Sequence, residues 1–196
     1  MVKLFFCLLL GYLIGSVNFA IVYSHLRRDD IRRHGSGNAG ATNVLRTYGA
    51  AAALFVFLFD VLKGVMAVLI VRLLFGKYDF QCAAALGAVL GHNFPLYYKF
   101  CGGKGVSTSF AVLLVLDWRV ALCALCVFLI TLLCFRYVSL SSVLAAASIP
   151  VSAFIFRGFD VFFFFTLITG VLCIARHHAN IKRLMAGNEN KLGAKK

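Results

Sequence analysis

Residues 50–75 read AAAALFVFLFDVLKGVMAVLIVRLLF, an apolar run in which Asp60, Lys63 and Arg72 are the charged side chains. A helix of about 20 apolar residues crosses the hydrocarbon core of a bilayer, so this run is long enough to span a membrane. Charges inside a span are costly unless they pair or serve a function. Because Asp60 and Lys63 lie three residues apart, we expect them to pair with each other in a structural role.

The composition of the whole chain agrees with this run. Of the 196 residues, 62% are apolar and 14% are charged, whereas soluble domains are about half apolar and a quarter charged. This composition excludes a soluble globular enzyme, a disordered chain and a secreted disulfide scaffold, and it predicts an all-α polytopic integral membrane protein. The net charge of +13 must be concentrated in short loops, where it favours anionic lipid headgroups or anionic substrates over nucleic acid.

The apolar runs predict seven transmembrane helices. We expect them at Leu4–Ser24, Ala50–Phe75, Cys82–Tyr98, Val106–Leu116, Arg119–Phe135, Tyr137–Phe156 and Val161–Ala175. Two are short or broken, Cys82–Tyr98 and Val106–Leu116, and the count falls to five if these two are re-entrant. Two small-residue motifs, Gly11-x-x-x-Gly15 and Gly87-x-x-x-Gly91, indicate close packing between helices.

The basic residues predict the orientation in the membrane. With seven spans, 14 of the lysines and arginines fall in the segments on one side and 5 in those on the other. Cytoplasmic loops carry the excess of Lys and Arg, so the N-terminus should lie outside and the C-terminus in the cytoplasm. The polar segments then all face the cytoplasm. We expect one membrane-embedded domain, residues 1–196, with three cytoplasmic motifs at about 32–46, 91–108 and 176–193.

The first motif, residues 34–46, reads HGSGNAGATNVLR. Its glycines permit positive φ, so that successive backbone N–H groups can converge on one anion. Polar side chains add donors, Arg46 adds a bidentate partner for phosphate, and the pair Thr42-Asn43 is expected to cap a short helix that carries Arg46. The candidate binding residues are Gly35, Ser36, Gly37, Asn38, Gly40, Thr42, Asn43 and Arg46. The alternative is a solvated connector, which would not need so many donors.

The second motif, residues 102–108, reads GGKGVST. A nucleotide-binding P-loop would need glycine where Tyr98 stands, so nucleotide binding is rejected. Glycines still let the backbone approach a phosphate, Lys104 supplies a positive charge, and a helix beginning near Val106 would direct its N-terminus at the anion. The candidate residues here are Gly102, Gly103, Lys104, Gly105 and Ser107, and a tight turn is the open alternative. His92, ten residues before the glycines, fits either a substrate contact or a structural hydrogen bond.

The third motif, residues 176–189, reads RHHANIKRLMAGNE. If the last span continues as a helix beyond the membrane, His177 and Asn180 share one face. The alternative is a basic membrane anchor, which explains the cations but not Asn180. Ser142 begins a span on the same side of the membrane, where serine is either a helix cap or a substrate contact.

The three motifs together resemble those of the PlsY family of bacterial acyl-phosphate:glycerol-3-phosphate acyltransferases. The resemblance rests on residues 35–46 (GSGNAGATNVLR), on GHNFP at 91–95 leading to GGKGV at 102–106, and on HHANIKRL at 177–184 with GNE at 187–189. It implies transfer of a fatty acyl group from acyl phosphate to the sn-1 hydroxyl of glycerol 3-phosphate. The products would be lysophosphatidic acid and phosphate, in phospholipid biosynthesis at the bacterial inner membrane. The enzyme that supplies acyl phosphate is an expected partner.

The resemblance also implies roles for individual residues. Ser36 and Arg46 would act at the reacting centre, the glycines of the second motif with Lys104 would cradle the glycerol phosphate, and His177 and Asn180 would complete the catalytic set. Glu189 would be structural. Either His177 or a phosphate oxygen of the donor would take the proton.

Two other functions fit the sequence less well, and a metal site is not indicated. A small transporter or channel would explain the buried polar groups, but its site should lie near the membrane midplane. A rhomboid-type serine protease would need glycine where His34 stands. The seven cysteines include Cys123-x-x-Cys126, yet no second pair or histidine lies nearby to complete a metal site. No metal or cofactor is therefore expected.

Overall fold

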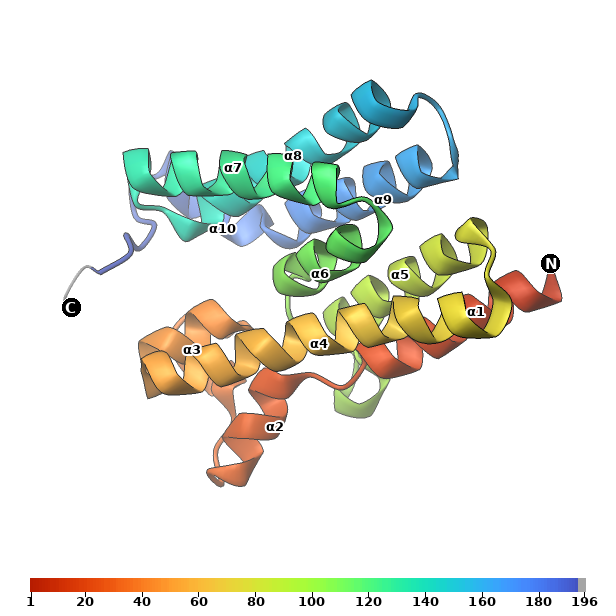
Figure 1. Cartoon of the computed structure of the whole chain (residues 1–196). Helices are drawn as coiled ribbons and strands as arrows, with labels where there is room; N and C mark the ends of the chain where they lie inside the picture. Colours follow the sequence, from red (N-terminus) through yellow and green to blue (C-terminus); the bar gives the residue numbers. More distant parts are fainter. Residues whose placement is uncertain (194–196) are drawn as a thin grey trace. The chain divides into compact units, whose positions relative to one another are not determined.

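The computed structural model describes residues 1–193, and within them it contains helices and no strand. Contacts between Cα atoms divide the chain into two compact units, Met1–Leu116 and Asp117–Lys196. The first unit holds α1 (Val2–Gly15), α2 (Phe19–Leu26), α3 (Ala41–Tyr48), α4 (Ala50–Phe75), α5 (Tyr78–Asn93) and α6 (Val106–Leu116), with short 3₁₀ turns η1 (Ile31–Arg33) and η2 (Leu96–Tyr98). The second holds α7 (Trp118–Phe135), α8 (Val138–Arg157), α9 (Val161–Arg176) and α10 (His178–Met185) (Figure 1).

Most predicted spans correspond closely to these helices, but Cys82–Tyr98 does not, because α5 begins at Tyr78 and ends at Asn93, and Leu96–Tyr98 is a separate 3₁₀ turn. Four segments are long and apolar enough to cross a membrane, namely Val2–Leu26, Ala50–Phe75, Trp118–Phe135 and Val138–Arg157, and there is a fifth if the bent pair α9–α10 is one span. The α5 helix is 16 residues long and α6 is 11, both shorter than a usual span. The all-α membrane class is confirmed, whereas the count of seven and the orientation stay predictions.

Two of the predicted segments contain a break or a bend. The first span is interrupted at Ser16–Asn18, where the Asn18 side chain caps α2 by accepting bonds from the backbone N–H groups of Ala20 and Ile21 at 3.1 and 3.2 Å. The last span does not continue straight, because α9 and α10 meet at His177 with a bend of 56°. The cap is a local feature, since asparagine is a favoured N-cap residue, whereas apolar periodicity does not predict the bend.

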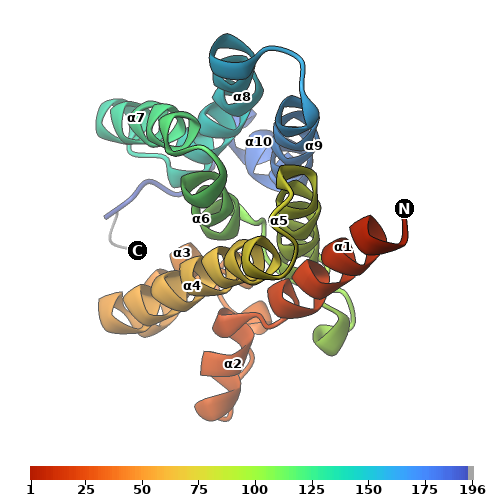
Figure 2. The same cartoon turned by 45° about the vertical axis from the view of Figure 1, so that its right-hand side comes forward.

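In the first unit, α1 packs directly on α5 (Figure 2), and the two small-residue motifs that indicated close helix packing lie in this contact. A Cβ at Gly11 or Gly15 would overlap the backbone of Ala84 or Ala88. A Cβ at Gly87 or Gly91 would equally overlap the backbone of α1. Glycine is therefore required on both helices for the backbones to touch. This contact holds the end of α5, and with it the second motif, next to the break in the first span.

In the second unit, α8 packs against both α7 and α9, and α10 contacts α8 and α9. Serine hydroxyls in the first turns of α8 donate to their own helix: Ser141 Oγ to the Tyr137 carbonyl at 2.9 Å and Ser142 Oγ to the Val138 carbonyl at 2.8 Å. Both side chains are buried.

Candidate active site

The first motif forms a turn-rich loop between η1 and α3. Gly35 and Gly37 adopt φ of +56° and +71°, the left-handed region expected for them. The Asn43 side chain reaches back from α3 across this loop, donating to the carbonyls of Ile31 and His34 at 3.2 and 2.9 Å and accepting from the Ser36 N–H at 2.9 Å. Asn43 is buried, whereas Ser36 is exposed.

This use of Asn43 differs from the sequence-based expectation. Both amide hydrogens of Asn43 are engaged by backbone carbonyls, so the side chain holds the loop in shape instead of offering donors to a ligand. The short helix carrying Arg46 is present as α3, and Arg46 is exposed on it. Its N-cap is Gly40 with no side-chain capping bond, so the expected cap by Thr42-Asn43 was wrong.

Three hydrogen-bonded side chains, those of Asp29, His34 and Tyr48, hold the start of this loop and are called the strap below. The Asp29 carboxylate accepts from His34 Nε2 at 2.8 Å and from the Tyr48 hydroxyl at 2.7 Å. These two bonds, that from His34 first, lower the pKa of Asp29 to about 2. Burial, and then the bond to Asp29, raises the pKa of Tyr48 to about 12. The strap ties the start of the first motif to the end of α3.

The second motif connects η2 to α6 and lies against the end of α5. The Gly103 N–H donates to the His92 carbonyl at 3.0 Å. A Cβ at Gly103 would overlap the imidazole of His92 and come within 2.7 Å of the Ala39 carbonyl oxygen in the first motif. Gly105 has φ of +78°, and a Cβ there would approach the Asn93 amide oxygen to 2.8 Å. The glycines thus permit both close contact and a left-handed turn, while Lys104 is half-buried.

Asn18, which sequence reasoning missed as a site residue, connects the first motif to the start of α2. Its Nδ2 donates to the Ala39 carbonyl at 3.2 Å while its Oδ1 caps α2. The feature of the sequence that could have identified Asn18 is that it is an asparagine within an otherwise apolar run. Arg32 makes a second link, since it pairs with Asp30 and donates to the Tyr98 carbonyl in η2 at 3.3 Å.

The expected pairing of Asp60 with Lys63 is present, with Lys63 Nζ 2.7 Å from Asp60 Oδ1. The same Nζ lies 2.9 Å from His92 Nδ1, so His92 joins this pair. All three residues are buried.

The third motif lies in the second unit and is organised around Glu189. The Glu189 carboxylate is buried and accepts from Ser139 at 2.9 Å, Asn180 at 2.8 Å and Arg183 at 2.7 Å. Burial raises the pKa of Glu189, but these three hydrogen bonds and the charge of Arg183 outweigh burial and lower that pKa below its usual value. Glu189 thereby fixes the orientation of the Asn180 side chain.

His177, at the bend between α9 and α10, is buried, and its Nδ1 lies 2.8 Å from the Cys173 carbonyl oxygen. A carbonyl oxygen only accepts, so Nδ1 carries a proton. This bond fixes the orientation of the ring at the bend.

The remaining predicted residues are placed as follows. Asn38, Gly40, Thr42, Gly102 and Ser107 are half-buried in or beside the two loops of the first unit. Ser142 donates to its own helix as described. Within residues 1–193, no group of three or more His, Cys, Asp or Glu side chains is arranged to hold a metal ion.

Comparison with known proteins identifies the chain. Residues 5–187 match the family model described as glycerol-3-phosphate acyltransferase. The glycerol-3-phosphate acyltransferase of Shouchella clausii is 44% identical, over 99% of this chain and 98% of that protein. The enzyme of the same name from Cupriavidus metallidurans is 42% identical, over 100% and 99%.

A solved structure agrees with these relatives. The crystal structure of PlsY (YgiH), an integral membrane glycerol 3-phosphate acyltransferase, in its glycerol 3-phosphate form superposes with a TM-score of 0.91 at 38% identity, covering 97% of this chain and 96% of that one. The fold and the motifs therefore define an integral membrane acyltransferase. The chain belongs to the glycerol-3-phosphate acyltransferase family, and the resemblance seen in its three motifs is confirmed.

Proposed function

We propose that this protein transfers a fatty acyl group from acyl phosphate to the sn-1 hydroxyl of glycerol 3-phosphate, releasing lysophosphatidic acid and inorganic phosphate. The observation that carries the proposal is the family match over residues 5–187, which includes all but the end of the third motif. A relative of known structure has been crystallised in a glycerol 3-phosphate form and in a lysophosphatidic acid form. This supports the same acceptor and product here, and it favours an acyltransferase over the transporter alternative.

The chemistry needs no acyl-enzyme, because acyl phosphate is already an activated mixed anhydride. The oxygen of the acceptor hydroxyl forms a bond to the acyl carbon, and the bond from that carbon to the phosphate oxygen breaks, with its electron pair leaving on phosphate. The hydroxyl proton passes either to His177 or to a phosphate oxygen. The protein then has to position two substrates and stabilise charge at the carbonyl and the leaving phosphate.

The loops of the first unit suit such a task. Positive φ at Gly35 and Gly37 turns the backbone around Ser36, and Asn43 fixes that turn. We assign Ser36 and exposed Arg46 to the acyl phosphate, because a guanidinium can bind a phosphate bidentately. We assign Gly102, Gly103 and Lys104 to the phosphate of glycerol 3-phosphate, since bare backbone and a point charge can approach it closely.

The third motif supplies the groups that handle the proton and orient the acceptor. The Cys173 carbonyl accepts from His177 Nδ1 and so orients the ring, and we assign His177 to the proton of the acceptor hydroxyl. Asn180, oriented by Glu189, is assigned to a hydroxyl of the acceptor.

The test of the function is an assay on the purified full chain in detergent with labelled glycerol 3-phosphate. Acyl phosphate should support the formation of lysophosphatidic acid acylated at sn-1, while acyl-CoA and acyl carrier protein thioesters offered alone should not. Transfer from a thioester but not from acyl phosphate would overturn the assignment of the donor. Acylation at sn-2 would overturn the assignment of the position.

We also propose that the motifs face the cytoplasm, as the distribution of basic residues predicts. Cys101, beside the glycine loop, is exposed. A variant that retains only this cysteine should react with a membrane-impermeant maleimide in inverted vesicles and not in right-side-out vesicles. The reverse pattern would contradict the orientation.

A further inference from the structure

A buried ionic cluster in the first unit has no part in the chemistry proposed above. It consists of Asp60 and Lys63 on α4 and His92 near the end of α5, which are 1%, 4% and 3% exposed. The Lys63 ammonium lies 2.7 Å from Asp60 Oδ1 and 2.9 Å from His92 Nδ1. Burying an ion pair in a membrane-spanning helix is costly. Pairing reduces this cost, but a pair of apolar side chains would avoid it.

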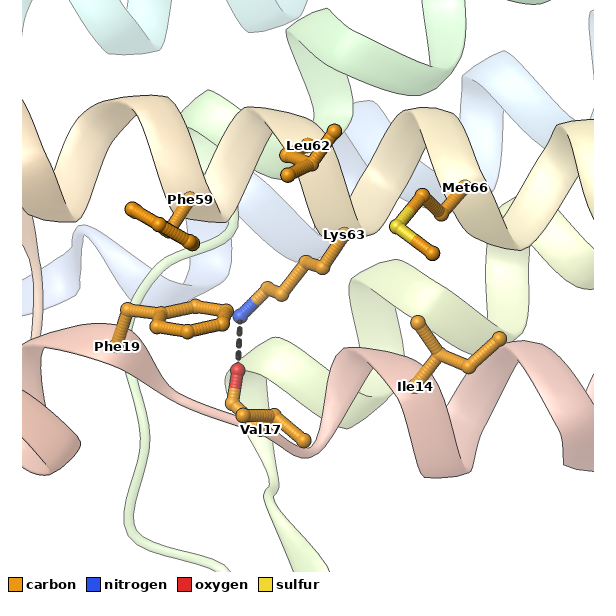
Figure 3. Close-up of a pocket in the computed structure, with 7 residues that line it drawn as sticks. All are labelled: Ile14, Val17, Phe19, Phe59, Leu62, Lys63 and Met66. Carbon is orange, nitrogen blue, oxygen red and sulfur yellow. Dashed lines mark hydrogen bonds between the residues drawn. The ribbon is translucent and has the colours of Figure 1, made fainter.

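The cluster reaches the break in the first span. Lys63 Nζ donates to the Val17 carbonyl at 2.8 Å, and the Phe19 ring lies beside the ammonium with its centre 6.0 Å away (Figure 3). Val17 is one of the residues between α1 and α2, so its carbonyl lacks the bond that a continuous helix would give it. The adjoining pocket of about 230 Å³ is lined by apolar side chains and by the Lys63 stem. Lys63 therefore holds the broken backbone in a region that offers few other polar partners.

His92 connects the ionic cluster to the second motif. An ammonium can only donate, so His92 Nδ1 accepts from Lys63 and the ring proton lies on Nε2. The Nε2 edge occupies the place that a Cβ of Gly103 would take, and the His92 carbonyl accepts from the Gly103 N–H at 3.0 Å. The side chain and the main chain of one residue thus both support Gly103.

A second connection from the same break reaches the first motif. Asn18, which follows Val17, donates to the Ala39 carbonyl at 3.2 Å. That carbonyl oxygen is also one of the atoms closest to Gly103, at 2.7 Å from where its Cβ would lie. The contacts therefore form a closed series. It runs from Lys63 to His92 and Gly103, and from Gly103 to Ala39 and Asn18. Asn18 follows Val17, whose carbonyl accepts from Lys63, so the series connects both loops.

We propose that Lys63 is a positioning residue for the reaction. Together with Asp60 it fixes the His92 ring, and the ring fixes the loop of residues 102–105 in the conformation that binds the phosphate of glycerol 3-phosphate. The proposal rests on the function proposed above. It explains why the charges are retained within the membrane, since an apolar pair could stabilise α4 against α5 but could not orient an imidazole.

The test replaces Lys63 with methionine, which keeps the length of the stem and removes the ammonium. With the purified chain in lipid nanodiscs, we expect Lys63→Met to raise the KM for glycerol 3-phosphate about tenfold, the consequence of a weakened binding loop. The KM for acyl phosphate should change less than about twofold. The matched control is Val71→Ala, a cavity at a fully buried position further along α4. It should lower the midpoint of thermal inactivation and leave both KM values unchanged.

A second variant keeps the proposal falsifiable if Lys63→Met does not fold. His92→Asn retains an acceptor near Lys63 but removes the Nε2 edge beneath Gly103, and it should raise the same KM. A wild-type KM for glycerol 3-phosphate in a folded variant of either kind, or a KM that also rises in Val71→Ala, would overturn the positioning role. Absence of acyltransfer by the wild-type chain would instead overturn the proposed function, so the two failures are distinguishable.

Discussion

Gly103→Ala is the most direct test of the glycine loop. The backbone of Gly103 has no positive φ, so alanine can adopt its conformation and the effect is purely steric. The new methyl group would overlap the His92 ring and lie 2.7 Å from the Ala39 carbonyl oxygen. Restoring an ordinary contact distance of about 3.5 Å to Ala39 alone requires a shift of about 0.8 Å, and the closer overlap with His92 requires a larger one.

The size of the effect follows from this shift. Overpacking of this kind costs about 1–3 kcal/mol, and the loop can relieve it by moving away from His92 toward the substrate side. A loss of about 1.4–2.8 kcal/mol of binding corresponds to a rise of about 10- to 100-fold in the KM for glycerol 3-phosphate. We expect kcat to fall less, because the contact is made in the ground state as well as in the transition state.

The assay measures KM for both substrates in one detergent, with Gly76→Ala as the control. Gly76 ends α4 at φ +67° and has no heavy atom within 4 Å of a built Cβ, so alanine there strains the backbone without crowding the loop. The control should lose stability and keep both KM values. An unchanged KM for glycerol 3-phosphate in folded Gly103→Ala would refute the reasoning. A rise in the acyl-phosphate KM alone would mean that the two phosphates are assigned to the wrong loops.

Three further predictions concern the other motifs. Lys104→Ala and Arg46→Ala should each lower kcat/KM by about 30- to 1,000-fold, equivalent to about 2–4 kcal/mol of transition-state stabilisation. Both variants should still elute as folded protein in size-exclusion chromatography. Activity near wild type in either variant would contradict the assignment. Ser36→Ala should lower kcat with a smaller change in KM, and steady-state kinetics with both substrates will show whether KM moves instead. Because the pKa of Asp29 is lowered to about 2, its strap should stabilise the protein above the unfolded-state pKa of about 3.9. This contribution should be lost as the pH falls toward 2. The difference in thermal midpoint between wild type and Asp29→Asn should therefore shrink over that range. A constant difference would show that the strap does not depend on the charge of Asp29.

Part of the fold followed from local patterns. The limits of α4 were predicted as Ala50–Phe75 and those of α6 as Val106–Leu116, and both match the structure. Membrane thickness sets the length of an apolar run, and the lack of water obliges the backbone to satisfy its own hydrogen bonds as helix. Close packing at the glycine motifs of α1 and α5 was equally predictable, because only glycine permits backbones to touch at that spacing, but which helices would pair was not.

The sequence also located the three motifs, since clustered glycines, amides and cations have few structural uses in so apolar a chain. It did not reveal what each side chain does. Asn43 was expected to contact substrate, yet its amide spans the loop to Ile31 and His34. Whether the last span continues as a helix beyond the membrane was left open, and the structure places a bend of 56° between α9 and α10 there.

What the sequence by itself determined is the class of protein, most helix limits and the places where chemistry can occur, because each depends on residues close together in the chain. Only the tertiary structure decided which polar groups serve one another. Lys63 and His92 are separated by 29 residues, Lys63 and Val17 by 46, and Ser139 and Glu189 by 50. A buried polar group takes whichever partner the packing of helices brings within about 3 Å, and no local pattern specifies that partner.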